Sequence, residues 1–163
     1  MKAVILKDAC VRSIAVVILL NAISDVRAQS RENIKLNQNA LAFAAQLSKE
    51  GHVITDGKGA WSKHRPSADE ENEFVRVHGF GEYAKWHLGI DDRYPENTKS
   101  RYKFPYGDFK NVHRCAVLAA ESRASKYEYS DIALAAGHLR NLLDALLAKQ
   151  RSIEKRRGHA RSV

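Results

Sequence analysis

The sequence predicts a mainly α-helical protein, a small helical bundle built around an antiparallel helix hairpin. Between residues 108 and 155, apolar side chains recur in steps of three and four, the spacing that places them on one face of a helix. A residue that can cap a helix precedes each periodic segment, Asp108 before the first and Ser130 before the second. Hydrophobic residues make up 44% of the 163-residue chain, enough for a modest core.

The hairpin is predicted over residues 108–127 and 131–155. Burying one leucine side chain is worth about 1.5–3 kcal/mol, so the apolar seam of the second helix needs a partner. The short connection 128–130 favours antiparallel packing against the first helix. The seam comprises Ile132, Ala135, Leu139, Leu142, Leu146 and Ile153, and the facing stripe comprises Phe109, Val112 and Ala116.

The N-terminal part of the domain is predicted to begin with a helix over residues 32–50. Its apolar residues have helical spacing, and Gly51 stands where a helix ends. The dipeptide Asp56-Gly57 then lies between short segments with β propensity. That arrangement favours a β-hairpin or, with so few flanking residues, a simple turn.

Two short helices are predicted in the middle of the chain, over residues 68–78 and 82–88. Ser67 and Glu70 have the spacing of a capping box, which satisfies free backbone amides at a helix start. Residues 91–100 contain a proline and many polar side chains, which favours an exposed loop.

The chain is predicted to have three regions: residues 1–30, a single helical domain over 31–150, and a basic, flexible tail over 151–163. Residues 1–30 have the basic start, apolar centre and small residues of a secretory signal cleaved after Ala28. Acidic and polar residues inside that segment favour an additional N-terminal segment instead. A cytoplasmic location is slightly favoured, whereas cleavage would place the protein in the periplasm or outside the cell. No stretch approaches the roughly 20 apolar residues of a membrane span.

Two blocks, W-S-x-x-R-P from Trp61 and K-F-P-Y-G-D-F-x-x-V-H-R from Lys103, resemble a family of small uncharacterised bacterial proteins. The resemblance covers residues 61–147 and implies one folded unit, but no reaction and no catalytic residues. The second block also distantly resembles a short helical module of phage-associated proteins, in which a Phe-Pro turn, an Asp cap and a His-Val pair open a helix. The matching residues here, with the last pair in reverse order, are Phe104, Pro105, Asp108, Val112 and His113.

The charge of the chain favours an anionic partner. The formal net charge is +8, and a cluster of cations is interleaved with aromatic residues on the approach to the hairpin. Cations contact phosphates and aromatic rings stack on unpaired bases, so this cluster is the predicted nucleic-acid-binding site. The alternative is a solvated basic surface beside a closed core. The five predicted contact residues are Lys99, Arg101, Lys103, Lys110 and Arg114.

Metal binding has little support in the sequence alone. His113 and Cys115 are two residues apart on a predicted helix, where side chains two apart point about 200° away from each other. A zinc site needs further ligands, and none stands at a matching spacing. The sequence therefore indicates no metal ligand and no cofactor.

Catalysis also lacks a recognisable motif, so the sequence assigns no catalytic residue. Cys115 or Ser122 beside a histidine would make a nucleophile and base, but no motif frames either residue. Asp91 and Asp92, near Glu96, would make a carboxylate pair, although adjacent aspartates in loops are usually solvated.

Taken together, these features predict a small basic helical protein that is non-catalytic and associates with nucleic acid. One alternative is a structural or protein–protein interaction module, such as a phage-derived accessory protein. In that case the seam through Leu139, Leu142 and Leu146 would contact another chain or a second copy. The second alternative is an enzyme of unknown class.

Overall fold

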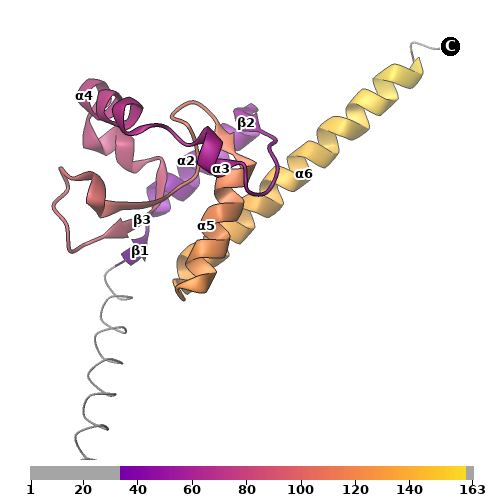
Figure 1. The fold of residues 1–163 in the computed structure, drawn as a ribbon. Helices are drawn as coiled ribbons and strands as arrows, with labels where there is room; N and C mark the ends of the chain where they lie inside the picture. The colour runs from indigo at the N-terminus through magenta and orange to yellow at the C-terminus, as the bar shows by residue number, and fades with distance from the viewer. Residues whose placement is uncertain (1–33, 161–163) are drawn as a thin grey trace, which may run out of the picture. The chain divides into compact units, whose positions relative to one another are not determined.

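The computed structural model describes residues 34–160, which combine helices with two small sheets (Figure 1). The prediction of an all-helical bundle is therefore wrong, and the fold is mixed α and β. The helices are α2 (Gln38–Glu50), α3 (Trp61–His64), α4 (Ala68–Ala84), α5 (Arg114–Lys126) and α6 (Ser130–Ala160), with a short 3-10 helix η1 (Lys99–Arg101). The strands are β1 (Ile34–Leu36), β2 (Val53–Ile54), β3 (His87–Asp91), β4 (Tyr102–Pro105) and β5 (Val112–His113).

A three-stranded antiparallel sheet in the order β1-β3-β4 replaces part of the predicted short helix 82–88. The helical segment stops at Ala84, and the chain then forms β3. Gly89 permits this, because a Cβ there would lie 2.8 Å from the ring of Phe104 on the neighbouring strand. The pairing of β3 with β4 is a contact between separate segments of the chain. The local spacing of apolar residues therefore does not predict it.

The predicted helix 32–50 is also divided. Residues 34–36 pair with β3, and α2 begins only after Asn37, whose side chain accepts a hydrogen bond from the amide of Ala40 (3.2 Å). Asn37 also donates to the carbonyls of Ala84 and His87, so it holds α2 against the end of α4. The C-terminal stop at Gly51 is confirmed, with φ of 90°.

Helix α4 begins with the predicted capping box. The Ser67 hydroxyl accepts a hydrogen bond from the amide of Glu70, whose carboxylate accepts one from the amide of Ser67. The helix continues past the predicted end at residue 78 through a kink at Gly79, where φ is 78°. Glycine adopts that conformation without the steric cost that a side chain would add.

The second sheet pairs β2 and β5 in parallel, with Val53 opposite Val112 and Ile54 opposite His113. Asp56-Gly57 therefore does not close a hairpin, since β2 pairs with a strand far along the chain. The predicted helix start at Asp108 is also wrong, because α5 begins at Arg114. Asp108 accepts hydrogen bonds from the amides of Lys110 (3.0 Å) and Asn111 (2.6 Å) in a tight turn.

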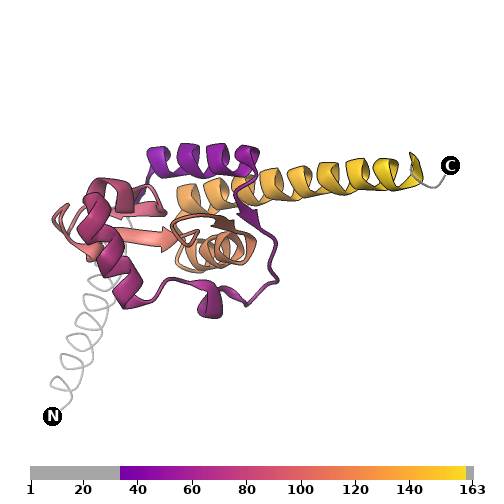
Figure 2. The same ribbon diagram turned by 90° about the horizontal axis from the view of Figure 1, so that it is seen from above.

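Helices α5 and α6 lie side by side as an antiparallel pair, and α2 runs along α6 on another side (Figures 1 and 2). Ile132, Leu139 and Leu143 of α6 are buried in the core, whereas Leu142 and Leu146 are half-buried. Two ion pairs join the helices, from Arg114 to Asp144 and from Arg140 to Glu121, each at 2.8 Å.

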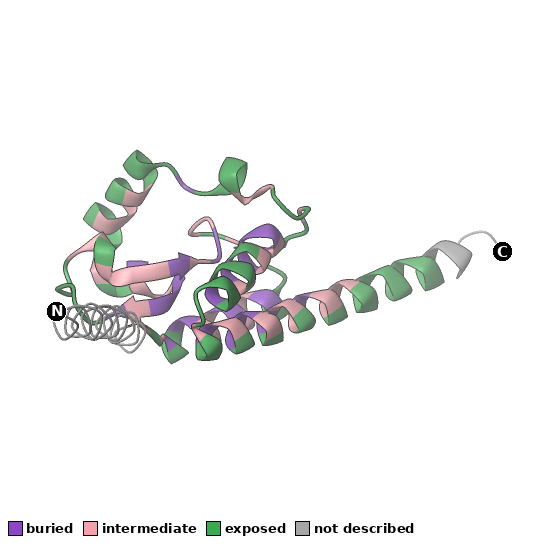
Figure 3. Ribbon diagram, turned by 60° about the horizontal axis from the view of Figure 1, so that its bottom comes forward, coloured by how far each residue is buried: buried purple, intermediate pink, exposed green. Residues whose placement is uncertain are grey.

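Toward its C-terminal end α6 becomes exposed (Figure 3), and the residues predicted as a basic tail continue this helix to Ala160. The predicted signal segment, residues 1–30, lies outside the described residues. Within residues 34–160, every helix is too short or too polar to cross a membrane.

Candidate metal centre

The parallel pairing of β2 with β5 brings Asp56 and Cys115 together. Ile54 lies opposite His113 at the ends of the two strands, and Asp56 and Cys115 each follow two residues later, Asp56 in the loop after β2 and Cys115 in the first turn of α5. Parallel strands run in the same direction, so both residues leave the sheet at the same edge. The carboxylate of Asp56 accepts a hydrogen bond at Oδ1 from the backbone amide of Cys115, at 2.7 Å.

Asp56 thereby caps helix α5 from a distant part of the chain. His113 is the residue before the helix and makes no side-chain capping bond of its own. A carboxylate at this end is also favoured by the partial positive charge of the helix N-terminus. Because Oδ1 serves this purpose, Oδ2 is left for other partners.

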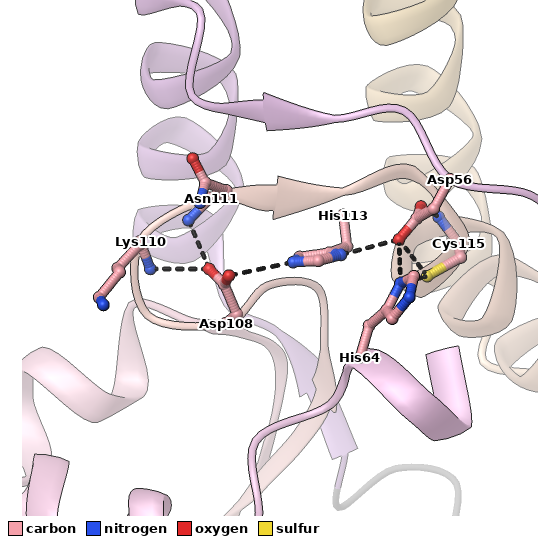
Figure 4. A network of polar contacts seen from close by, with 7 residues as sticks. All are labelled: Asp56, His64, Asp108, Lys110, Asn111, His113 and Cys115. Atoms are coloured by element: carbon pink, nitrogen blue, oxygen red, sulfur yellow. Dashed lines mark hydrogen bonds and ion pairs between the residues drawn. The ribbon is translucent and has the colours of Figure 1, made fainter. Parts of the chain in front are cut away.

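Three side chains surround Oδ2 of Asp56 (Figure 4). Nδ1 of His64 lies 2.6 Å away, Nδ1 of His113 2.8 Å away and Sγ of Cys115 2.9 Å away. His64 comes from α3, whereas His113 and Cys115 stand on either side of the β5–α5 junction. The four residues Asp56, His64, His113 and Cys115 are called the Cys-His-His-Asp cluster below.

The donor atoms of this cluster all lie within 4.8 Å of one another. The side chains of Asp56 and His113 are 7% and 8% exposed and Cys115 is buried, whereas His64 is 38% exposed. The distance from Sγ of Cys115 to Nδ1 of His64 is 3.9 Å. In a tetrahedral zinc site the bond lengths imply separations of about 3.3–3.6 Å between nitrogen and sulfur ligands. That one distance is close to these values, whereas the contacts of Oδ2 of Asp56, at 2.6–2.9 Å, are shorter. An ion at the centre of the four donor atoms would therefore require Oδ2 to move outward.

The side chains of Asp56 and Cys115 have pKa values shifted in opposite directions. Burial raises the pKa of the Asp56 carboxyl, but hydrogen bonds from Cys115, His113 and His64 outweigh it and bring that pKa well below its ordinary value. Burial and the adjacent Asp56 carboxylate raise the pKa of the Cys115 thiol to about 12. At neutral pH the pair is thus a carboxylate beside a protonated thiol.

His113 faces a carboxylate on each side of its ring. Nδ1 points to Asp56, and the buried Nε2 lies 3.1 Å from Oδ2 of Asp108, at ion-pair distance but without a well-aligned hydrogen bond. A neutral imidazole has one N–H and cannot donate to both. When a cation replaces the proton between Nδ1 and Asp56, the proton of the ring stands on Nε2 toward Asp108 and the lone pair of Nδ1 binds the cation. Metal-bound histidines are typically oriented by such a carboxylate.

Sequence reasoning missed this cluster for a physical reason. His113 and Cys115 would point apart if both stood on one helix, but His113 has extended backbone angles (φ −95°, ψ 121°) and precedes the helix. The other two donors come from residues 51 to 59 positions away, as the contacts of Cys115 with His64 and Asp56 show. The one local signal is the occurrence of His64 and His113 within the two blocks of the family resemblance, with Asp56 shortly before the first block and Cys115 directly after the second.

Most of the five cations predicted to bind nucleic acid contact other side chains of the protein. Three are paired with carboxylates: Lys99 with Glu71 (3.1 Å), Arg101 with Asp92 (3.1 Å) and Arg114 with Asp144 (2.8 Å). Nζ of Lys103 lies 5.1 Å from the ring centre of Tyr94, and Lys110 is exposed on the turn after Asp108. Nucleic-acid binding through these residues stays a prediction.

The other candidate residues do not converge either. Asp91 is fully buried and paired with Arg93 (2.8 Å), while Asp92 contacts Lys35 (2.8 Å) and Arg101. Each carboxylate thus has cations of its own. Ser122 is exposed on α5.

Comparison with family models, with curated proteins and with solved structures finds no match to this chain.

Proposed function

We propose that the protein is a zinc-binding protein in which the Cys-His-His-Asp cluster holds one Zn²⁺ ion. The observation that carries the proposal is the convergence of four donor atoms within 4.8 Å, from the loop after β2, helix α3, strand β5 and helix α5. One of these donors, His113, is also oriented by the carboxylate of Asp108, 3.1 Å from its other ring nitrogen.

The chemistry of the donors favours zinc over other common ions. A thiolate with two imidazoles is typical of zinc sites, whereas magnesium and calcium prefer oxygen ligands. The thiolate of Cys115 and the carboxylate of Asp56 together balance the two positive charges of the ion. A half-buried site without net charge avoids most of the cost of burying an unpaired charge.

Four protein ligands fill a tetrahedral site, which is the arrangement of structural zinc centres. The segment that carries His64 needs such support. Between β2 and α4 the chain forms only the four-residue helix α3, which has no buried residue of its own. An ion bound to Asp56 and His64 as well as to His113 and Cys115 would fasten this segment to the start of α5. Zinc binding then contributes directly to folding, as in other small metal-stabilised units.

A cysteine nucleophile fits the geometry less well. Reactive cysteines have a lowered pKa, which keeps them as thiolates at neutral pH. The pKa of Cys115 is raised to about 12, because the thiol is buried and donates to a carboxylate. A bound cation reverses this effect, since it replaces the thiol proton.

The test is metal analysis of protein reconstituted under reducing conditions. We expect one equivalent of zinc per chain in the natural protein and in His138→Ala, a control in which an exposed histidine on α6 is removed. His64→Ala and His113→Ala should hold far less than one equivalent after dialysis. Equal zinc content in all four proteins would rule out the proposed site.

Cobalt substitution tests the sulfur ligand directly. Co²⁺ bound to a thiolate gives a charge-transfer absorption in the near ultraviolet that nitrogen and oxygen ligands do not give. The chain has two cysteines, so Cys10→Ala is the matched control for Cys115→Ala. The band should persist in the first variant and vanish in the second. A band that follows Cys10 would contradict the assignment.

A further inference from the structure

A cavity of about 420 Å³, separate from the Cys-His-His-Asp cluster, lies between the α3–α4 connection, strand β4 and helix α5. Small-molecule pockets typically have volumes of about 300–1,000 Å³ and aromatic walls. The aromatic side chains that line this cavity are Trp61, Tyr83, Tyr102, Phe104 and Phe109. None of the four residues of the Cys-His-His-Asp cluster lines it.

Two of these aromatic residues have strained backbone. Phe104 has φ of 59° and Phe109 has φ of 68°, the left-handed region that residues with side chains seldom adopt. Within residues 34–160 one other non-glycine residue, Glu128, shares this property. Strained residues often gather at binding sites, where the surrounding structure holds them in place. Here they place two rings against the same cavity.

His87 supplies a hydrogen-bond acceptor at the cavity wall. The residue is 4% exposed, and its Nδ1 lies 2.9 Å from the backbone carbonyl of Tyr83. A carbonyl only accepts, so Nδ1 carries the proton and Nε2 presents a lone pair. Burial lowers the pKa of His87 to about 4, which keeps the ring neutral at pH 7. Nε2 has no hydrogen-bond partner among the described residues.

The charge at the cavity is positive. Lys99 and Glu71 both line it and form an ion pair at 3.1 Å, so their charges largely cancel. Arg65 and Arg123 also line it, and neither forms an ion pair with a residue that the structure describes. Two guanidinium groups without a carboxylate partner favour an anion.

We infer that this cavity binds a small anion with a planar ring that carries an N–H or O–H donor. The ring would lie against the aromatic walls, its donor would bond to Nε2 of His87, and its anionic group would contact Arg65 and Arg123. A nucleoside monophosphate and an amino-substituted aromatic acid both have this chemistry. The two sites share no residue, although Arg65 of this cavity is next to His64 of the zinc site in the sequence.

Isothermal titration of the full chain with two probes tests the inference and distinguishes the sources. Adenosine 5′-monophosphate represents the phosphate class and 4-aminobenzoate the carboxylate class. We expect saturable binding of one equivalent of at least one probe. The analogue of that probe with a dimethylated amino group should bind at least tenfold more weakly, because it cannot donate to His87. Equal binding of the two forms, or of inorganic phosphate, would overturn the inference.

Variants connect the binding to the cavity. Arg65→Gln combined with Arg123→Gln should weaken binding at least tenfold, whereas Arg151→Gln, on the exposed part of α6 and outside the cavity, should leave it unchanged. No saturable binding of either probe to the natural protein, or no effect of the double variant, would refute the site. Circular dichroism of the same samples shows whether the variants are folded. Their zinc content shows whether the zinc proposal fails separately from this one.

Discussion

Asp108 shows why the chemistry of a single residue was recognised while its role was not. An Asp side chain that accepts amides two and three residues ahead is a feature of helix starts and of tight turns alike. Asp108 makes these contacts with Lys110 and Asn111, but the chain then enters β5 instead of a helix. Its second oxygen faces Nε2 of His113, a contact that no local pattern predicts.

The role of Asp108 in orienting His113 leads to a testable prediction. Asp108→Asn keeps an oxygen for the turn amides and replaces the carboxylate oxygen near His113. We expect zinc affinity to fall about 10–100-fold, as for other carboxylates behind a ligating histidine. Competition with a chromophoric chelator measures the change, and Asp131→Asn, an exposed aspartate at the start of α6, is the control. Unchanged affinity in Asp108→Asn would contradict this role.

At the scale of elements, the helix α5–α6 pair follows from local signals, and the sheets do not. The spacing of the leucines and the Ser67–Glu70 capping box are local features, so the sequence predicts the helices that contain them. The strands are two to five residues long and pair with partners far along the chain, which periodicity over a short window does not detect. The candidate metal site depends on the pairing of β2 with β5, so the sequence alone does not predict it.

Helix α6 offers a matched pair of leucines. Leu143 is fully buried, whereas Leu134 on the same helix is 63% exposed. Leu143→Ala should lower the free energy of unfolding by about 2–5 kcal/mol, because it leaves a cavity in the core. Leu134→Ala should change it by less than about 0.5 kcal/mol. Denaturant unfolding measures both changes. Similar losses of stability in the two variants would contradict the placement of Leu143 in the core.

Strand β3 ends in a buried charge with a clear dependence on pH. Hydrogen bonds from Arg93 lower the pKa of Asp91 below its ordinary value, although burial opposes them. The native protein thus favours the ionised form, and this contribution to stability is present above about pH 4 and is lost as the pH falls further. Asp91→Asn should cost about 1–3 kcal/mol at pH 7.

That cost should shrink in unfolding experiments below about pH 4, because Asp91 of the unfolded chain takes up a proton there before Asp91 of the native protein does. Asp92→Asn is the neighbouring control. Its carboxylate is 37% exposed, and ion pairs of that kind are worth less than about 1 kcal/mol. A cost for Asp91→Asn that stays constant down to pH 2 would refute the contribution of the ionised form.

At the scale of the molecule, the Cys-His-His-Asp cluster would join parts of the chain that pack little otherwise. The segment between β2 and α4 contains only the short helix α3, which has no buried residue. Trp61 and Arg65 of this segment also line the cavity described above. A zinc ion there would hold both the segment and one wall of that cavity in place.

Limited proteolysis tests this mechanical role. Lys58 and Lys63 are exposed trypsin sites within the segment. Cleavage there should be severalfold faster after zinc is removed with a chelator, whereas cleavage at Arg151 on α6 should not change. His64→Ala should be cleaved rapidly with or without zinc. Equal rates for the zinc-loaded and zinc-free natural protein would show that the ion does not restrain the segment.

X-ray absorption at the zinc edge of the purified, reconstituted protein tests the zinc centre most directly. The Cys-His-His-Asp cluster predicts one sulfur neighbour at about 2.3 Å and three nitrogen or oxygen neighbours at about 2.0–2.2 Å. A spectrum without sulfur, or with only water-like oxygen neighbours, would contradict a zinc ion bound to Cys115.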